Sequence, residues 1–151
     1  MQGFYNLTDK IKEHLLSDKD VKSVTTGDIT RVDLSKQTAF PLSHLIVNNA
    51  TNSRTILTFD ISVIAMDIVN QSKEETVDIF RGNNNEQDIL NTQLVVLNKL
   101  VEVLKRGDLH TELYQVVTDA TFEPFYDRFE NEVAGWVASF SVQVPNDIDI
   151  C

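Results

Sequence analysis

Residues 55–69, with the sequence TILTFDISVIAMDIV, decide the fold class of this chain because they have its strongest strand pattern. One set of alternate side chains is apolar, and in the first half of the segment the other set is polar. The apolar set is Leu57, Phe59, Ile61, Val63 and Ala65. From Ile61 to Val69 both sets are largely apolar, which is typical of a strand covered on two sides. One cover could be a helix and the other a neighbouring subunit.

The segments before this strand predict a helix and further extended structure. Apolar residues recur at every third or fourth position over Phe4–Ser17, which indicates an amphipathic helix. Val21–Val32 is extended in character but has no clear pattern. Leu42–Asn48 is predicted to be a strand, and the polar residues 48–54 are predicted to form the loop that joins it to strand Thr55–Val69.

The segments after the central strand predict a second helix. Asn70–Asp88 has no clear period and is predicted to be a long loop. Glu86–Arg106 has a broad apolar stripe, acidic residues in its first turn and basic residues in its last, which together indicate a helix. Gly107 follows at the position where helices commonly end in a left-handed residue.

The last third of the chain predicts two closing strands. Leu113–Val117 is predicted to be a short strand, and Thr118–Asn131 a turn-rich aromatic stretch. Glu132–Val144 alternates, and Pro145 ends the strand. Its apolar face consists of Trp136, Ala138, Phe140, Val142 and Val144. The tail 146–151 alternates polar and apolar residues, so it could pair with a neighbouring chain.

Together these segments predict an α+β fold. We expect a single domain over residues 1–151, with a mostly antiparallel, twisted sheet and a short C-terminal tail at 146–151. Two main helices, at about residues 3–17 and 86–106, are expected to pack on one face of the sheet.

The charge balance limits the possible partners. The chain has 13 basic and 23 acidic residues, and its formal net charge is −10. Binding to nucleic acid needs lysines and arginines that displace phosphate counterions, and no basic run is present. An acidic surface repels DNA, so it suits the wall of a channel through which DNA passes without sticking. The simpler interpretation is that the acidity keeps the protein soluble.

No catalytic, metal or cofactor motif stands out, and we expect none of these functions. His14, His44 and His110 lack metal-ligand spacing, and Cys151 is the only cysteine. The chain has no nucleophile elbow and no glycine-rich phosphate loop. Among many acids, Asp60 and Asp67 lie seven positions apart on the central strand and so on opposite faces. We also expect no signal peptide and no membrane span.

The aromatic stretch is the clearest candidate for packing or contact. Phe122, Phe125, Tyr126 and Phe129 lie among acidic residues with one arginine, which disfavours stacking on nucleic acid. Core packing or a subunit contact is the better interpretation, since aromatic residues are enriched in interface cores.

The order of these elements resembles the tail terminator, or tail-completion, family of tailed bacteriophages and the related head-tail connector and neck-ring proteins. The likeness spans the full length and includes the terminal strand with Gly135-Trp136 and residues 140–145, FSVQVP. The resemblance implies a virion protein, made in the host cytoplasm, that forms a homo-oligomeric ring at the neck or the head-proximal end of the tail. It implies a hexamer, or alternatively a dodecamer, that contacts connector, neck and tail tube proteins and leaves a lumen for DNA.

For such a ring we predict two kinds of contact. Axial contacts would involve residues 33–40 and 70–85, including Phe80, Asn83 and Asn84. Lateral contacts would involve the aromatic stretch 122–129 together with Ile148 and Ile150 of the tail.

The alternative is a cytosolic module that binds a small molecule or a peptide, or an unrecognised enzyme with an acidic site. A deep pocket with convergent polar groups beneath the second helix would favour this alternative.

Overall fold

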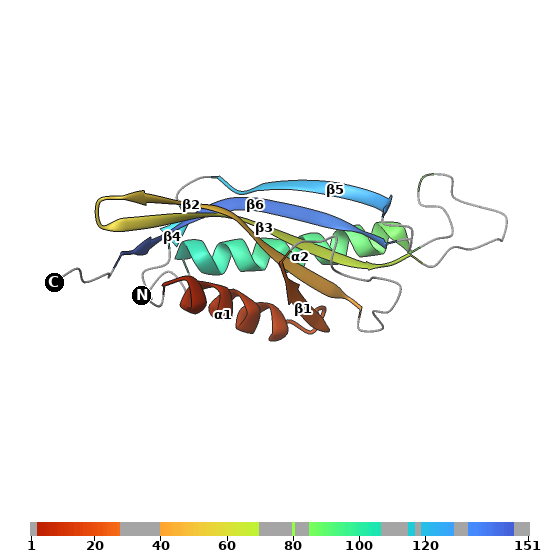
Figure 1. The fold of residues 1–151 in the computed structure, drawn as a ribbon. Helices are drawn as coiled ribbons and strands as arrows, with labels where there is room; N and C mark the ends of the chain where they lie inside the picture. Colours follow the sequence, from red (N-terminus) through yellow and green to blue (C-terminus); the bar gives the residue numbers. More distant parts are fainter. Residues whose placement is uncertain are drawn as a thin grey trace.

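The computed structural model describes residues 3–27, 40–69, 80, 85–106, 115–116, 119–128 and 133–146. Two helices and six strands occur in these ranges (Figure 1). They are α1 (Gly3–Leu16), β1 (Ser23–Thr26), β2 (Leu42–Ser53), β3 (Ile56–Ile68), α2 (Glu86–Arg106), β4 (Gln115–Val116), β5 (Thr121–Arg128) and β6 (Val133–Pro145). The predicted α+β class is confirmed, and both helices lie where the sequence predicted them.

The six strands form one sheet in the order β1-β2-β3-β6-β4, with β5 also paired to β6. The β1–β2 pair is parallel and every other pair is antiparallel. β3 and β6 pair along their whole length, from Ile56 opposite Pro145 to Ile68 opposite Val133. The strand that decided the fold class in the sequence therefore lies in the middle of the sheet, as its two apolar faces require.

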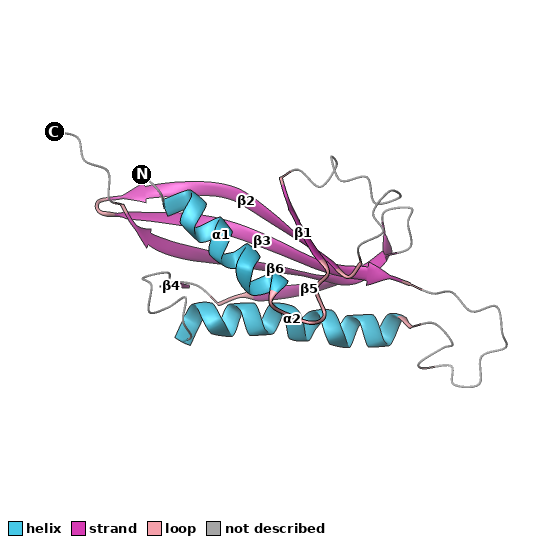
Figure 2. Cartoon of the chain, turned by 90° about the horizontal axis from the view of Figure 1, so that it is seen from below, coloured by secondary structure: helices cyan, strands magenta, loops and turns pink. Residues whose placement is uncertain are grey.

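Both helices pack on the same face of the sheet, and the main core lies between them and it (Figure 2). The alternate apolar side chains predicted for β3 and β6 point into this core. α1 contributes Leu7, Ile11 and Leu15, and α2 contributes Val96, Leu97, Leu100, Val101 and Leu104. The predicted placement of the two helices on one face is confirmed.

Around Ile64 and Met66 the opposite face of β3 is covered by the chain itself. Ile64 and Met66 are 6% and 0% exposed, and they belong to a second apolar cluster with Leu42, Phe125 and Val133. A neighbouring subunit is therefore not needed to bury these two side chains, although Ile68 on the same face is 40% exposed. The sequence pattern showed that two covers exist, but it could not show that β5 of the same chain contributes to the second one.

Gly135 allows β3 and β6 to approach closely in this region. A Cβ atom on Gly135 would lie 1.9 Å from the carbonyl oxygen of Ala65, which is a main-chain atom that cannot rotate away. Gly135 pairs with Met66 on one side and with Phe125 on the other. The glycine is thus required by sterics and not by a left-handed backbone conformation.

The predicted loop at residues 48–54 is mostly strand, so that prediction was wrong. β2 continues to Ser53 and pairs with β3 up to Ile56, and the turn consists of Arg54 and Thr55. Arg54 has a φ of 53°, as tight hairpin turns require. Residues 48–55, which form the end of this β2–β3 hairpin arm, are exposed. Since neither of their faces is buried, they lack the apolar alternation by which a half-buried strand is recognised in a sequence.

The predicted turn-rich stretch at 118–131 was also wrong over most of its length, because residues 121–128 form β5. Pro124 lies inside this strand. A proline is tolerated there because β5 is an edge strand that pairs only with β6 among the described residues. Within Val21–Val32 the strand is limited to β1, and residues 28–32 lie outside the described ranges, as does most of the predicted loop 70–88.

Candidate interaction surfaces

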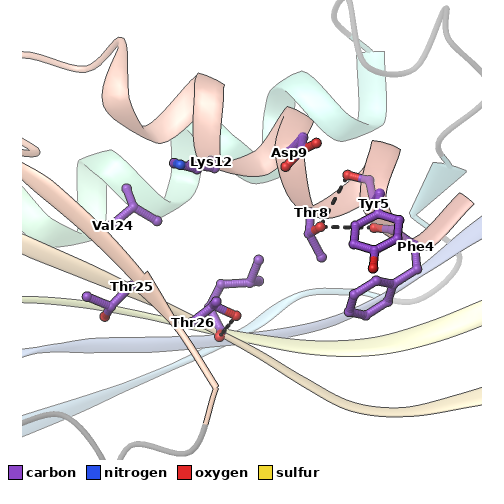
Figure 3. A pocket seen from close by; sticks show the side chains of 9 residues that line it. Phe4, Tyr5, Thr8, Asp9, Lys12, Val24, Thr25 and Thr26 are labelled. Carbon is purple, nitrogen blue, oxygen red and sulfur yellow. Dashed lines mark hydrogen bonds between the residues drawn. The ribbon is translucent and has the colours of Figure 1, made fainter. Parts of the chain in front are cut away.

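A largely apolar groove separates α1 from the edge strand β1 (Figure 3). Its volume is about 300 Å³. One wall comes from α1 and the other from the β1–β2 edge. The lining residues are Phe4, Tyr5, Thr8, Asp9, Lys12, Val24, Thr25, Thr26 and Leu45. One acid and one base are present, so the groove has no formal net charge.

Two exposed aromatic side chains stand at one end of this groove. Phe4 is 45% and Tyr5 is 64% exposed, whereas Leu7, Ile11 and Leu15 of the same helix are fully buried. The ring of Phe4 packs edge-on against Phe59 of β3, with centroids 6.1 Å apart, and against Tyr5 at 5.8 Å. These contacts fix the rings in place while leaving much of their surface uncovered. Exposed aromatic surface beside a groove is typical of a contact site.

A buried histidine holds β1 against β2. His44 is fully buried on β2; its Nε2 lies 2.7 Å from the carbonyl oxygen of Gly27 and its Nδ1 lies 2.6 Å from the hydroxyl of Thr25. A carbonyl only accepts, so Nε2 carries the hydrogen and donates it, while Nδ1 accepts from Thr25. The histidine that sequence reasoning considered as a metal ligand thus has a structural role.

The face of the sheet away from the helices is polar near its centre. Asn48 donates to the hydroxyl of Ser62 at 2.9 Å, and Ser62 lies 3.4 Å from Ser139. The hydroxyl of Ser141 donates to the carboxylate of Asp60. A shallow hollow of about 230 Å³ lies beside these residues. These polar groups already form hydrogen bonds to one another across three strands. We therefore interpret them as part of the polar surface of the sheet and not as a ligand site.

The residues predicted as contacts fall into three groups. Phe125 is 3% exposed and packs in the second cluster, and Phe122 packs against the main core, which corresponds to the core role considered for this stretch. Tyr126 and Phe80 are 54% and 85% exposed. The other predicted contacts lie outside the described residues; they are Phe129, Ile148, Ile150, Asn83 and Asn84.

Among the described residues, the pKa values of His14 and Asp67 are shifted by their surroundings. Burial lowers the pKa of His14; the nearby charge of Asp18 opposes this and that of Lys99 adds to it. Burial raises the pKa of Asp67, and a hydrogen bond from the Ile68 amide opposes that shift. His14 lies on α1 and Asp67 near the end of β3. Within the described ranges, no three His, Cys, Asp or Glu side chains converge as a metal site would require.

Neither hollow lies beneath α2, since no α2 residue lines either of them. In the part of the chain that the structure covers, no helix is long and apolar enough to cross a membrane. No known protein-family model matches this chain, and no characterised protein matches its sequence significantly.

Sequence reasoning missed the groove because no local pattern marks it. Phe4 and Tyr5 at the start of an amphipathic helix were the available signal, and Tyr5 lies outside the apolar stripe. The other wall depends on β1 pairing in parallel with β2, which brings residues 23–26 next to residues 42–45.

Proposed function

We propose that this protein is the subunit of a homo-oligomeric ring in a tailed-phage virion, at the neck or the head-proximal end of the tail. The observation that carries the proposal is the pair of open edges of the sheet. β1 forms one edge, and β4 and β5 lie along the other, with no further strand beyond either among the described residues. A contact between two unlike edges is heterologous, and heterologous contacts generate rings when the rotation closes.

The charge of the chain agrees with a ring around DNA. A net charge of −10 gives a surface that repels the phosphate backbone, so DNA can pass without being held. The order of helices and strands, which resembles that of tail terminators and neck-ring proteins, supports the same assignment. Connector, neck and tail tube proteins are then the expected axial partners.

The groove at α1 favours a different candidate, a module that binds an extended peptide. A peptide strand can add to an open sheet edge and place alternate side chains in an adjacent hollow. Such a protein would act on another protein's segment, and it would need no ring.

The native mass of the purified protein separates these two functions. We expect light scattering after size exclusion to give a closed oligomer, a hexamer or a dodecamer, and negative-stain images to show rings. A monomer at every concentration, both alone and with virion partner proteins, would contradict the ring and favour the peptide-binding module.

A further inference from the structure

The outer edge of β1, beside the groove, has main-chain groups that no strand of the described residues pairs with. The amides of Ser23 and Gly27 donate to the carbonyls of Pro41 and Leu45, so odd-numbered residues of β1 face β2. Main-chain groups alternate in direction along a strand, so the N–H and C=O groups of Val24 and Thr26 point away from β2. Within the described residues no other strand pairs with them. Such an edge is a template for one more strand.

The side chains of the same two residues point toward the helices. Val24 pairs with Ser43 and Thr26 with Leu45, and Val24 and Leu45 both pack in the main core. A strand added at this edge would place the side chains opposite Val24 and Thr26 on the same face. Those two side chains, two positions apart, would enter the apolar groove under Phe4 and Tyr5.

One segment of this chain has the required pattern. Residues 147–151, Asp-Ile-Asp-Ile-Cys, place Ile148 and Ile150 on one face of an extended strand and the aspartates on the other. At about 3.3 Å per residue, five residues span roughly 16 Å, enough to lie along the four residues of β1.

The position from which this segment leaves the sheet favours a second copy as the acceptor. β6 ends at Pro145, and the amide of Asn146 donates to the carbonyl of Thr55 in the hairpin turn, at 2.7 Å. The arm formed by β2 and β3 at this turn is exposed over residues 48–55. The segment therefore starts beside an exposed hairpin turn, where another molecule can approach.

We infer that residues 147–151 of one copy add as a strand to the free edge of β1 in a second copy, with Ile148 and Ile150 in the groove between α1 and β1. The aspartates then face the opposite side of the sheet. This inference rests on the proposed self-association of the protein. The contact joins two different surfaces, so it is heterologous and can link copies around a ring.

A peptide-binding experiment tests this contact without requiring ring assembly. The probe is a fluorescent peptide spanning residues 144–151, and the receptor is the full chain with Ile148→Asp, whose own segment cannot compete. We expect saturable binding by fluorescence anisotropy. Adding Tyr5→Glu to the receptor should weaken binding at least about tenfold, as loss of an aromatic hot-spot contact does. Adding Val95→Glu, at a 41% exposed position on α2 outside the groove, should not.

Assembly of the full chain then identifies which copy provides the segment. We expect Ile148→Asp and Tyr5→Glu each to abolish assembly, and a mixture of the two to form heterodimers, since one intact segment and one intact groove remain.

Absence of saturable peptide binding, or binding unaffected by Tyr5→Glu, would overturn the inference even if the wild-type chain forms rings. A wild-type chain that stays monomeric and binds the peptide only after Ile148→Asp would indicate that the segment occupies its own groove, which also overturns it. A ring of wild-type chains that both variants leave intact would contradict the contact but not the proposed function.

Discussion

Replacing Gly135 by alanine tests the closest approach in the sheet. The added Cβ atom would lie 1.9 Å from the carbonyl oxygen of Ala65, whereas carbon and oxygen atoms in contact are about 3.3 Å apart. Strands β3 and β6 would have to separate locally by about 1.4 Å, against a normal spacing of about 4.8 Å. That displacement would lengthen the ladder hydrogen bonds around Met66 and disturb the packing of Phe125.

We expect Gly135→Ala to lower the free energy of unfolding by about 3 kcal/mol or more, the upper part of the range for overpacked cores. For a chain of this size that corresponds to a melting temperature lower by roughly 6–12 °C. Urea unfolding followed by circular dichroism measures the change. The matched control is Gly27→Ala, where no atom lies within 4 Å but φ is +105°, so only backbone strain of about 1–2 kcal/mol is added.

A loss below about 1 kcal/mol for Gly135→Ala, or a loss no larger than that for Gly27→Ala, would contradict a steric requirement for glycine at this position. It would mean that the two central strands can separate without cost and that the close approach does not limit the residue at this position.

Three further predictions concern ionisable or polar side chains. His44→Phe should lower the free energy of unfolding by about 2–4 kcal/mol, because it leaves the Gly27 carbonyl and the Thr25 hydroxyl without their partner. Thr25→Val removes only one of the two hydrogen bonds and should cost clearly less. Equal losses for the two variants in urea unfolding would contradict the two-bond geometry. The pKa of His14 is lowered in the folded protein, so its stabilising contribution is present above pH 6.5 and is lost as pH falls through the folded pKa. His14→Gln should therefore flatten the fall in the free energy of unfolding below pH 6.5. An unchanged dependence of unfolding free energy on pH would argue against burial as the cause of the shift. The pKa of Asp67 is raised in the folded protein, so the fold favours the protonated carboxyl and the free energy of unfolding falls as pH rises through the folded pKa. Asp67→Asn keeps an acceptor for the Ile68 amide, so it should stabilise the protein slightly at pH 7 and lose that advantage near pH 3. Destabilisation by this substitution at pH 7 would contradict the raised pKa.

Predictions from sequence succeeded where local pattern and burial agree. The helix Glu86–Arg106 has its stripe, its charges and its following glycine within one segment, and the structure begins and ends it at the predicted residues. Strand β3 likewise alternates in its own sequence, and its apolar set lies in the core. The arm at residues 48–53 and strand β5 were missed because pairing with a neighbour, and not alternation, makes them strands.

The α+β class, both helices, the central strand and the acidic charge could all be predicted from the sequence alone, since each follows from residue type and spacing along the chain. The folded arrangement was needed to show which strands lie at the edges of the described sheet, that His44 bonds to β1, and that Gly135 lies against Ala65. The same arrangement places Phe4 and Tyr5 beside β1, where they line the groove between α1 and this strand. Each of these features brings together residues that lie far apart in the sequence. They result from strand pairing and helix packing, and no local sequence pattern specifies which strands pair or where a helix packs.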